Sequence, residues 1–356
     1  MSQIDSIIAE DFAESSINIS ELTAVDFSNW DAYIQQHPSA TFFHKAGWKQ
    51  VLEEAFGHTC YFLIATQSDK IRGVLPLGRV KSSLFGDALI STPFCVYGGV
   101  LADNEDIAAL LETHACELAD SLQVDYLELR NKLKRHADWP SKDMYVYFRK
   151  EIMADTEENL KAIPRKQRAV VRKGIKADLD VSNEVNVDNL YFAYSSSVRN
   201  LGTPVFSKKY FATLLEVFAE DCGVTTISKN DETISSVLSF YFKDEVLPYY
   251  GGGTSAARGL KANDFMYWEL LKQSGETGVK YFDYGRSKQG AGSYSFKKNW
   301  GFVAEPLFYE YYLVKSKSIP EVNPNNPKYK YFIDIWRRLP LSVANFLGPF
   351  ISRSLG

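Results

Sequence analysis

The sequence has few of the residues that most often build a metal site or a catalytic triad. Its four cysteines form no CxxC pair and stand among apolar residues, which predicts reduced thiols in the core; they are Cys60, Cys95, Cys116 and Cys222. The last of its five histidines is His136. A metal site or a Ser-His-Asp triad in the second half of the chain is therefore excluded.

Long apolar runs and a strong charge of either sign are also missing. No apolar run reaches the roughly 18 residues that suggest a membrane span. The first residues, MSQIDSIIAEDF, are acidic and lack the basic start and apolar core of a signal peptide, so we expect a cytoplasmic protein. The net charge of −4 gives no global field for nucleic acid, and an anionic partner would need a local basic patch.

Apolar residues are plentiful, and their spacing repeats. The 356 residues suggest two domains, and 45% hydrophobic and 14% aromatic content can fill two cores. The order helix, helix, strand, turn, strand, glycine-containing strand, long helix, strand occurs twice. In the first copy we expect helices at 28–36, 45–56 and 105–122 and strands at 60–66, 71–80, 88–100, 124–129 and 145–148. In the second we expect helices at 187–200, 207–220 and 260–276 and strands at 224–228, 233–242, 246–250, 279–283 and 307–314. This order predicts a structural duplication.

The repeat divides the chain into four parts. We expect a flexible N-terminus at 1–20, a first domain at 21–150, a second domain with the site at 151–315, and a basic, aromatic tail at 316–356. The tail is expected either to dock on the second domain or to lie on a membrane surface or a partner.

Residues 246–302 gather three consecutive glycines, a Gly-Arg-Ser turn, a Lys-Lys pair and many aromatics. Tyr249 and Tyr250 precede the glycines, where the backbone can approach a ligand, or they only pack the sheet. If the segment around Lys297 and Lys298 is extended, one lysine faces an aromatic pocket and the other faces out. The inward lysine could stabilise an oxyanion; the alternative is a surface pair.

Two further groups of cations are candidates. Arg286 follows Asp283 closely and could clamp a substrate or pair with that carboxylate. From residue 163 to 176 the chain is basic with no acid, and on a helix Arg168, Arg172 and Lys176 form one row. This helix is either an anion clamp or a solvated basic face. His44, beside aromatics, is expected to be structural.

The element order resembles the GNAT (N-acetyltransferase) fold, and two such units in tandem resemble the FemAB-like aminoacyltransferases that build peptidoglycan interpeptide bridges. Residues 282–287 (FDYGRS) and 293–302 (SYSFKKNWGF) are similar to the Phe-Lys-Lys-x-x-Gly-Phe block of that family. Residues 163–173 (IPRKQRAVVRK) resemble the basic helix that begins its second domain. The similarity covers roughly residues 20–356 and is greatest to the branch associated with PEP-CTERM/exosortase exopolysaccharide loci.

The resemblance implies an α+β fold of two tandem GNAT-like domains. It also implies a transferase that moves an acyl or aminoacyl group to an amine on an anionic, sugar-linked cell-envelope or exopolysaccharide precursor. The enzyme would be cytoplasmic, and membrane-peripheral if the tail contacts lipid. The donor would be aminoacyl-tRNA or acyl-CoA, and in the first case tRNA would be a partner. No tightly bound cofactor and no metal would be needed. The catalytic residues would be Lys297, Lys298 and Tyr250; the substrate-binding residues would be Arg165, Lys166, Arg168, Arg172, Lys173, Tyr249, Gly252, Asn263, Asp283, Arg286, Ser287 and Trp300.

Two alternative functions remain compatible with the sequence. GNAT enzymes hold the acyl-CoA pyrophosphate with a glycine-containing loop, and here Lys261 and Asn263 stand at the glycine positions. The chain could be a non-catalytic precursor-binding protein with a degenerate GNAT pair, or an acyl-CoA N-acyltransferase despite the missing glycines.

Overall fold

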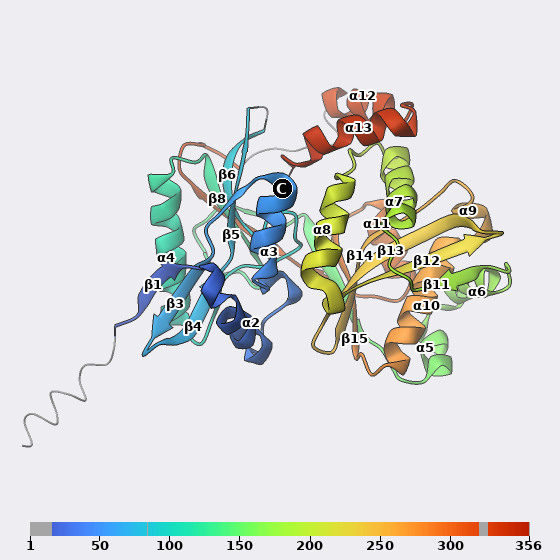
Figure 1. Ribbon diagram of the computed structural model, residues 1–356, viewed down its shortest axis with the longest axis horizontal. Helices are drawn as coiled ribbons and strands as arrows, with labels where there is room; N and C mark the ends of the chain where they lie inside the picture. Colours follow the sequence, from blue (N-terminus) through green and yellow to red (C-terminus); the bar gives the residue numbers. More distant parts are fainter. Residues whose placement is uncertain (1–15, 84, 320–326, 356) are drawn as a thin grey trace, which may run out of the picture.

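The computed structural model describes residues 16–83, 85–319 and 327–355. Most of the N-terminal segment that we expected to be flexible, residues 1–15, lies outside this part of the chain. The described residues form two sheet-centred units side by side, with a helical tail packed across one end (Figure 1).

The first unit has two sheets. A four-stranded sheet has the order β1-β3-β4-β7, and a six-stranded sheet has the order β2-β5-β6-β8-β17-β9. The strands are β1 (Asn18–Glu21), β2 (Thr59–Cys60), β3 (Leu63–Gln67), β4 (Lys70–Leu75), β5 (Leu77–Ser82), β6 (Gly86–Ser91), β7 (Leu101–Ala102), β8 (Tyr126–Asn131), β9 (Ser141–Lys142) and β17 (Phe308–Leu313). The helices are α2 (Phe27–Gln36), α3 (Gly47–Val51), which continues as a π-turn over Leu52–Phe56, and α4 (Glu105–Ser121).

The second unit has one seven-stranded sheet, β11-β12-β13-β14-β15-β10-β16. Its strands are β10 (Tyr145–Glu151), β11 (Asp180–Ser182), β12 (Cys222–Lys229), β13 (Glu232–Phe242), β14 (Glu245–Gly253), β15 (Tyr281–Lys288) and β16 (Ala304–Pro306). Its helices are α5 (Thr156–Ala162), α6 (Arg165–Ile175), α7 (Val187–Leu201), α8 (Lys208–Phe218), α9 (Ala257–Leu260), α10 (Ala262–Glu276) and α11 (Gly292–Asn299).

Local sequence explains where several helices begin and end. The Asn104 side chain accepts a hydrogen bond from the Ile107 amide at 3.0 Å and starts α4, and the Ser207 hydroxyl does the same for α8. Gly57 ends the α3 segment in the left-handed conformation, at φ 72°, which glycine adopts without strain. The helix that we expected to begin at Ser28 begins one residue earlier.

The two units exchange a strand, which the sequence pattern did not predict. We expected residues 145–148 to complete the first sheet and residues 307–314 to complete the second. Instead β10 lies between β15 and β16 in the second unit, and β17 pairs with β8 in the first. Periodicity identifies a strand but not its partner, because the partner is chosen by long-range packing.

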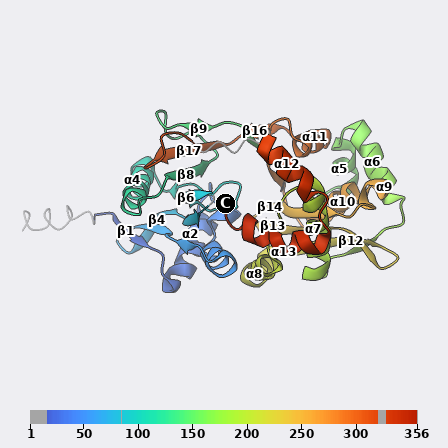
Figure 2. The same ribbon diagram turned by 90° about the horizontal axis from the view of Figure 1, so that it is seen from above.

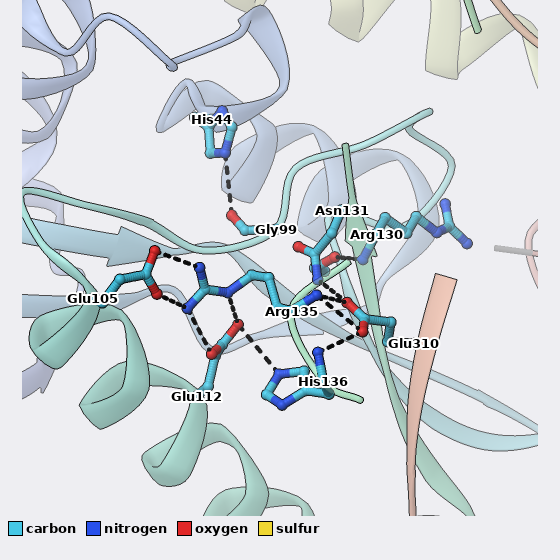
Figure 3. Close-up of polar contacts among 10 residues, drawn as sticks. His44, Gly99, Glu105, Glu112, Arg130, Asn131, Arg135, His136 and Glu310 are labelled. Atoms are coloured by element: carbon cyan, nitrogen blue, oxygen red, sulfur yellow. Dashed lines mark hydrogen bonds and ion pairs between the residues drawn. The ribbon is translucent and has the colours of Figure 1, made fainter. Parts of the chain in front are cut away.

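A buried carboxylate fixes the exchanged strand β17. Glu310 is fully buried and accepts hydrogen bonds from the Asn131 amide at 2.8 Å, the His136 backbone N–H at 2.7 Å and the Arg135 backbone N–H at 3.1 Å. Figure 3 shows these donors converging on Glu310, while the Arg135 guanidinium lies between Glu105 and Glu112. A buried charge is stable only with such partners, so Glu310 holds β17 in this register.

The expected strand at 88–100 is only partly correct. The chain is extended as β6 in the six-stranded sheet, forms a loop over residues 92–100, and continues as β7 in the four-stranded sheet. Gly98 and Gly99 therefore lie in this loop and not in a strand equivalent to the Gly251–Gly253 strand. The 92–100 loop extends toward the second unit and becomes part of the site.

Aromatic side chains from both units share one core. Phe42 stacks on Phe240 with ring centroids 4.2 Å apart and contacts Phe218 at 4.7 Å, while Phe43 contacts Tyr249 at 5.2 Å. Phe42 and Phe43 are fully buried. Truncating one such ring typically costs about 3–5 kcal/mol, so this core stabilises the units as a pair.

The tail forms α12 (Pro327–Trp336) and α13 (Leu341–Ser352), which pack across α7 (Figures 1 and 2). The Ser352 hydroxyl donates to the Val205 carbonyl at 3.0 Å, and His58 of the first unit lies 2.8 Å from the Arg353 carbonyl. The tail therefore docks on the second unit, which is the first of the two alternatives given in the sequence analysis. None of the helices in the described part of the chain is long and apolar enough to cross a bilayer.

Candidate active site

The sheet of the second unit opens between β14 and β15. These parallel strands pair only at Glu245 with Tyr281 and at Val246 with Phe282. Beyond this point β14 carries a bulge at Tyr249, next to Pro248, whose ring nitrogen has no N–H to donate, and the strands diverge. The opening contains a cavity of about 680 Å³.

Both units and the tail line this cavity. Phe94, Val96 and Arg130 come from the first unit, and Leu355 comes from the tail. The second unit contributes Tyr194, Ser197, Leu201, Phe206, Pro248, Tyr249, Tyr250, Gly251, Gly252, Asn263, Met266, Tyr267, Tyr284, Gly285, Arg286, Gly292, Ser293, Phe296 and Lys297. Eight of these 23 lining residues are aromatic and three are cationic.

Lys297 points inward, but from a helix. Residues 292–299 form α11, so the expected extended conformation is wrong, although the two lysines do face different ways. Lys297 is 8% exposed, and its ammonium donates to the carbonyls of Gly285 at 3.1 Å and Arg286 at 2.9 Å. Burial lowers the pKa of Lys297 to about 8. An ammonium has three donors, so one remains for a ligand in the cavity.

Lys298 is exposed and does not line the cavity; its ammonium lies 5.5 Å from the centre of the Tyr294 ring. Phe296 and Trp300 are four residues apart, which is the spacing of one helix face. That spacing was the signal for a helix in this segment.

Arg286 is exposed to the cavity, and its guanidinium donates to the Tyr309 hydroxyl at 2.9 Å. Its guanidinium carbon lies 4.6 Å from the centre of the Tyr145 ring. Within residues 16–83, 85–319 and 327–355, no carboxylate forms an ion pair with Arg286. The alternative in which it pairs with Asp283 is therefore wrong.

Asp283 does not line the cavity. It is 1% exposed and accepts hydrogen bonds from the Tyr97 hydroxyl at 2.5 Å and the Gly285 backbone N–H at 2.6 Å. Tyr97 belongs to the 92–100 loop, so Asp283 joins the two units. It also fixes the bulge in β15 that precedes Arg286, so the expected Gly-Arg-Ser turn is instead part of a strand.

The two tyrosines before the glycines line the cavity, but their hydroxyls are engaged. Tyr249 donates to the Phe94 carbonyl at 3.0 Å, and the hydroxyls of Tyr250 and Tyr210 lie 2.7 Å apart. Burial raises the pKa of Tyr250 well above its ordinary value. Tyr250 can therefore donate a hydrogen bond but is a poor proton acceptor.

Gly252 and Asn263 also line the cavity. A Cβ on Gly252 would stand 2.8 Å from the Ala193 carbonyl, so this glycine allows α7 to pack on β14. Ser287 and Trp300 are buried and outside the cavity lining; Trp300 packs beside Tyr284 in the core.

The basic helix α6 lies apart from this cavity. Its cations form a groove of about 460 Å³ that shares no lining residue with the first cavity. The groove is lined by Arg165, Arg168, Ala169, Arg172, Lys173 and Lys176. Lys166 is the one basic residue of the expected set that does not line it. Within the described ranges, none of these cations forms an ion pair. A Cβ on Gly174 would stand 2.8 Å from Phe265 Cβ, which places α6 against α10. The cations of α6 therefore do not line the cavity between β14 and β15.

Several lining residues were not expected. Phe94, Val96 and Arg130 lie in the first unit, outside the domain in which we expected the site, and Leu355 lies in the tail. The sequence signal for Arg130 is the segment YLELRN at 126–131, which is similar to YFDYGRS at 281–287.

His44 is structural, as expected. Its ring accepts from the Thr41 backbone N–H at 3.1 Å and lies 3.1 Å from the Gly99 carbonyl (Figure 3). Burial lowers its pKa to about 4. Across the described residues, no three His, Cys, Asp or Glu side chains are placed to hold a metal ion.

Comparisons with known proteins identify the fold. Residues 159–298 match the model of the acetyltransferase (GNAT) domain. FemX superposes with a TM-score of 0.64 at 14% identity, over 84% of this chain and 98% of FemX. No curated protein matches the sequence.

Two other solved structures have the same arrangement. A tandem GNAT protein from the clavulanic acid biosynthesis pathway has a TM-score of 0.53 at 11% identity, over 83% of this chain and 98% of that one. The C-terminal domain (DUF2156) of a candidate lysylphosphatidylglycerol synthetase from Agrobacterium fabrum has a TM-score of 0.54 at 13% identity, over 80% and 92%. The chain therefore has the α+β fold of two tandem GNAT-like domains, as the element order predicted.

Proposed function

We propose that the chain is an acyltransferase that moves an activated acyl or aminoacyl group to an amine on an anionic acceptor. The observation that carries the proposal is the cavity between β14 and β15, where Lys297 and Arg286 meet beside Tyr250. The match of residues 159–298 to the GNAT domain supports the reaction type.

The charges on the cavity wall favour a neutral amine. Arg130, Arg286 and Lys297 line it, and its described lining contains no Asp, Glu or His. Positive surroundings disfavour an ammonium, so a bound amine loses its proton more readily than in water. The amine nitrogen attacks the acyl carbonyl, the ester or thioester bond breaks, and the amine proton leaves with the departing alcohol or thiol. Correct positioning supplies much of the acceleration.

Lys297 has the free donor that an oxyanion needs. Two of its N–H groups are held by the carbonyls of Gly285 and Arg286, which orient the third. Negative charge appears on the acyl oxygen only as the transition state forms, so this contact lowers the barrier without tightening ground-state binding.

Arg286 is suited to hold an anionic group of the acceptor. Its guanidinium has five donors, and the structure assigns one of its nitrogens to Tyr309. An arginine fork binds carboxylate or phosphate in a bidentate manner. The resemblance to the exopolysaccharide-associated branch supports a sugar-linked precursor as the acceptor class.

The groove on α6 would bind a phosphate that is distant from the reacting carbonyl. Asn263 and Tyr267 of α10 line the reaction cavity, whereas Gly174 of α6 packs on Phe265 of the same helix. One helix, about 10 Å wide, therefore separates the groove from the cavity. Aminoacyl-tRNA and acyl-CoA both carry phosphates at such a distance. Changing Arg168 and Arg172 to Ala should weaken donor binding in a salt-dependent way with little change in melting temperature.

A non-catalytic precursor-binding protein is the second candidate. It is favoured by Lys261 and Asn263, which stand where the resembling donor loops carry glycine. Lys261 nevertheless adopts φ 59° and ψ 31°, the left-handed conformation that glycine adopts readily. The loop therefore keeps a glycine-like backbone at this position.

Changing Lys297 to Met tests the proposal. The wild-type protein is first screened against CoA thioesters and aminoacyl-tRNAs with amino sugars as acceptors. We then expect Lys297→Met to lower kcat on the order of 10²-fold with little change in KM. Lys298→Met, on the exposed side of the same helix, is the matched control and should keep full activity. Full turnover by a folded Lys297→Met protein would exclude the catalytic role, and binding without transfer by any pair would favour the second candidate.

A further inference from the structure

The tail has two faces of different character. Ala344, Gly348 and Ser352 recur every four residues on α13, and all three are buried against the second unit. On the opposite side Phe346 and Phe350 are 69% and 66% exposed, and their rings contact each other at 5.8 Å. The docked face explains how the tail is held but not why its outer face is apolar.

The tail as a whole, α12 and α13 together with Leu355, holds more exposed apolar side chains than any other stretch of comparable length in the described chain. Eight of the eighteen large hydrophobic residues that are exposed there belong to the tail, although the tail is less than a tenth of the described residues. We call these eight residues the tail surface: Tyr331, Phe332, Ile335, Val343, Phe346, Leu347, Phe350 and Leu355. Soluble monomers rarely expose a contiguous apolar patch without a partner for it.

The charge around the tail surface is positive. From residue 327 onward the sequence has five Lys or Arg residues and a single acid, Asp334, whereas the whole chain has a net charge of −4. Lys330 and Arg338 are exposed, and Asp334 lies 3.8 Å from Arg337. Aromatic and aliphatic side chains with flanking cations are typical of helices that lie on anionic lipid.

The tail surface also reaches the mouth of the reaction cavity. Leu355 belongs to both, and Leu201, which is 62% exposed, lines the cavity beside the docked tail. The C-terminus lies at the junction of the two units (Figures 1 and 2). A flat surface that contacts the tail would therefore lie next to the opening of the cavity.

We propose that the tail surface docks the protein on an anionic lipid bilayer, with the cavity mouth at the membrane. A second copy is a poorer occupant, because a symmetric dimer through this face would bring one basic rim against another. Docking does not rest on the acyl-transfer chemistry, since lipid binding is measured without turnover.

The test is co-sedimentation of the full chain with vesicles. We expect binding to mixed phosphatidylcholine and phosphatidylglycerol vesicles, decreasing with salt, and little binding to pure phosphatidylcholine. The double variant Lys330→Gln with Arg338→Gln removes two positive charges and should weaken binding to the anionic vesicles roughly 30-fold. Phe346→Ser with Phe350→Ser should weaken it at least about tenfold.

Matched controls remove equally exposed apolar side chains elsewhere. Leu133→Ser and Val303→Ser, at positions 77% and 74% exposed, should bind vesicles as the parent does, and melting curves check that every variant is folded. Absence of binding, equal binding to neutral vesicles, or unchanged binding by the tail variants would overturn the proposal. A dimer without lipid that Phe346→Ser and Phe350→Ser convert to a monomer would also overturn it and assign the face to a second copy.

Discussion

The two units carry a similar short motif where their sheets open, and the surroundings of that motif differ. In the first unit β6 and β8 pair in parallel, and β8 reads YLELRN over Tyr126–Asn131. In the second unit β14 and β15 pair in parallel, and residues 281–287 of β15 read YFDYGRS. The second motif has one extra residue before its arginine, which forms a bulge inside β15 opposite Phe148, and Gly285 in that bulge adopts φ 65°.

That extra residue changes the partner of the arginine. In the first unit Arg130 is 3% exposed and donates to the Glu128 carboxylate at 2.7 Å and to the Cys95 carbonyl at 2.7 Å. In the second unit the bulge at Gly285 directs Arg286 away from Asp283 and into the cavity. The 92–100 loop occupies the first opening, whereas the second stays open. One insertion thus separates a structural arginine from one available to a ligand.

Replacing each arginine in turn tests this comparison most directly. Arg130→Met should lower the free energy of unfolding by about 3–5 kcal/mol, because it leaves the buried Glu128 carboxylate without its partner. Arg286→Met should leave that free energy nearly unchanged and raise KM for an anionic acceptor roughly 10–100-fold. Urea unfolding and steady-state kinetics of both variants measure the two effects. Similar stability losses in both variants would show that Arg286 is structural too.

The buried histidine of the first unit should make stability sensitive to acid. The folded-state pKa of His44 is about 4, below the ordinary 6.5, so the unfolded chain binds the proton first and stability falls as pH drops from 6.5 to 4. This shift is worth on the order of 3 kcal/mol. Urea unfolding between pH 7 and pH 4 should show a shallower decline for His44→Gln than for the parent. Parallel declines would assign the acid sensitivity to other groups.

The buried lysine of the second unit should instead make activity sensitive to base. The pKa of Lys297 is about 8, so its ammonium is present below that pH and lost above it. If the ammonium stabilises the oxyanion, kcat should fall about tenfold per pH unit above pH 8 until it reaches the Lys297→Met level. The pH profile of Lys297→Met, which should lack this fall, is the control. A parent profile that is flat to pH 10 would contradict the role.

The smallest expected effect concerns Gly285, at the bulge of β15 that precedes Arg286. Gly285→Ala places a Cβ at φ 65° with ordinary 3.6 Å contact to Val96, so only strain of about 1–2 kcal/mol is expected. Gly278→Ala, at φ 88° in open space, should lose similar stability and serves as the control. Only Gly285→Ala should also lose activity, through displacement of Arg286. Equal activities of Gly285→Ala and Gly278→Ala would mean that the bulge at Gly285 does not position Arg286.

Local sequence signals indicated most of the elements and their repeated order. The helical spacing of α4, the glycine that ends the α3 segment and the Ser207 cap are local features, since propensity and capping depend on near neighbours. The same local information placed a candidate site between residues 246 and 302. Tyr249, Tyr250, Gly252, Asn263, Arg286 and Lys297 of that stretch do line one cavity.

Long-range packing sets which of these residues come together and which partner each strand takes. The exchange of β10 and β17 depends on Glu310 reaching donors near Asn131, about 180 residues away in the chain. The separation of the α6 groove from the cavity follows from packing across α10. Residues 292–299 form a helix in which the rings of Phe296 and Trp300, four residues apart, both pack beside Tyr284. Such contacts join residues that are distant in sequence, and a local pattern carries no information about them.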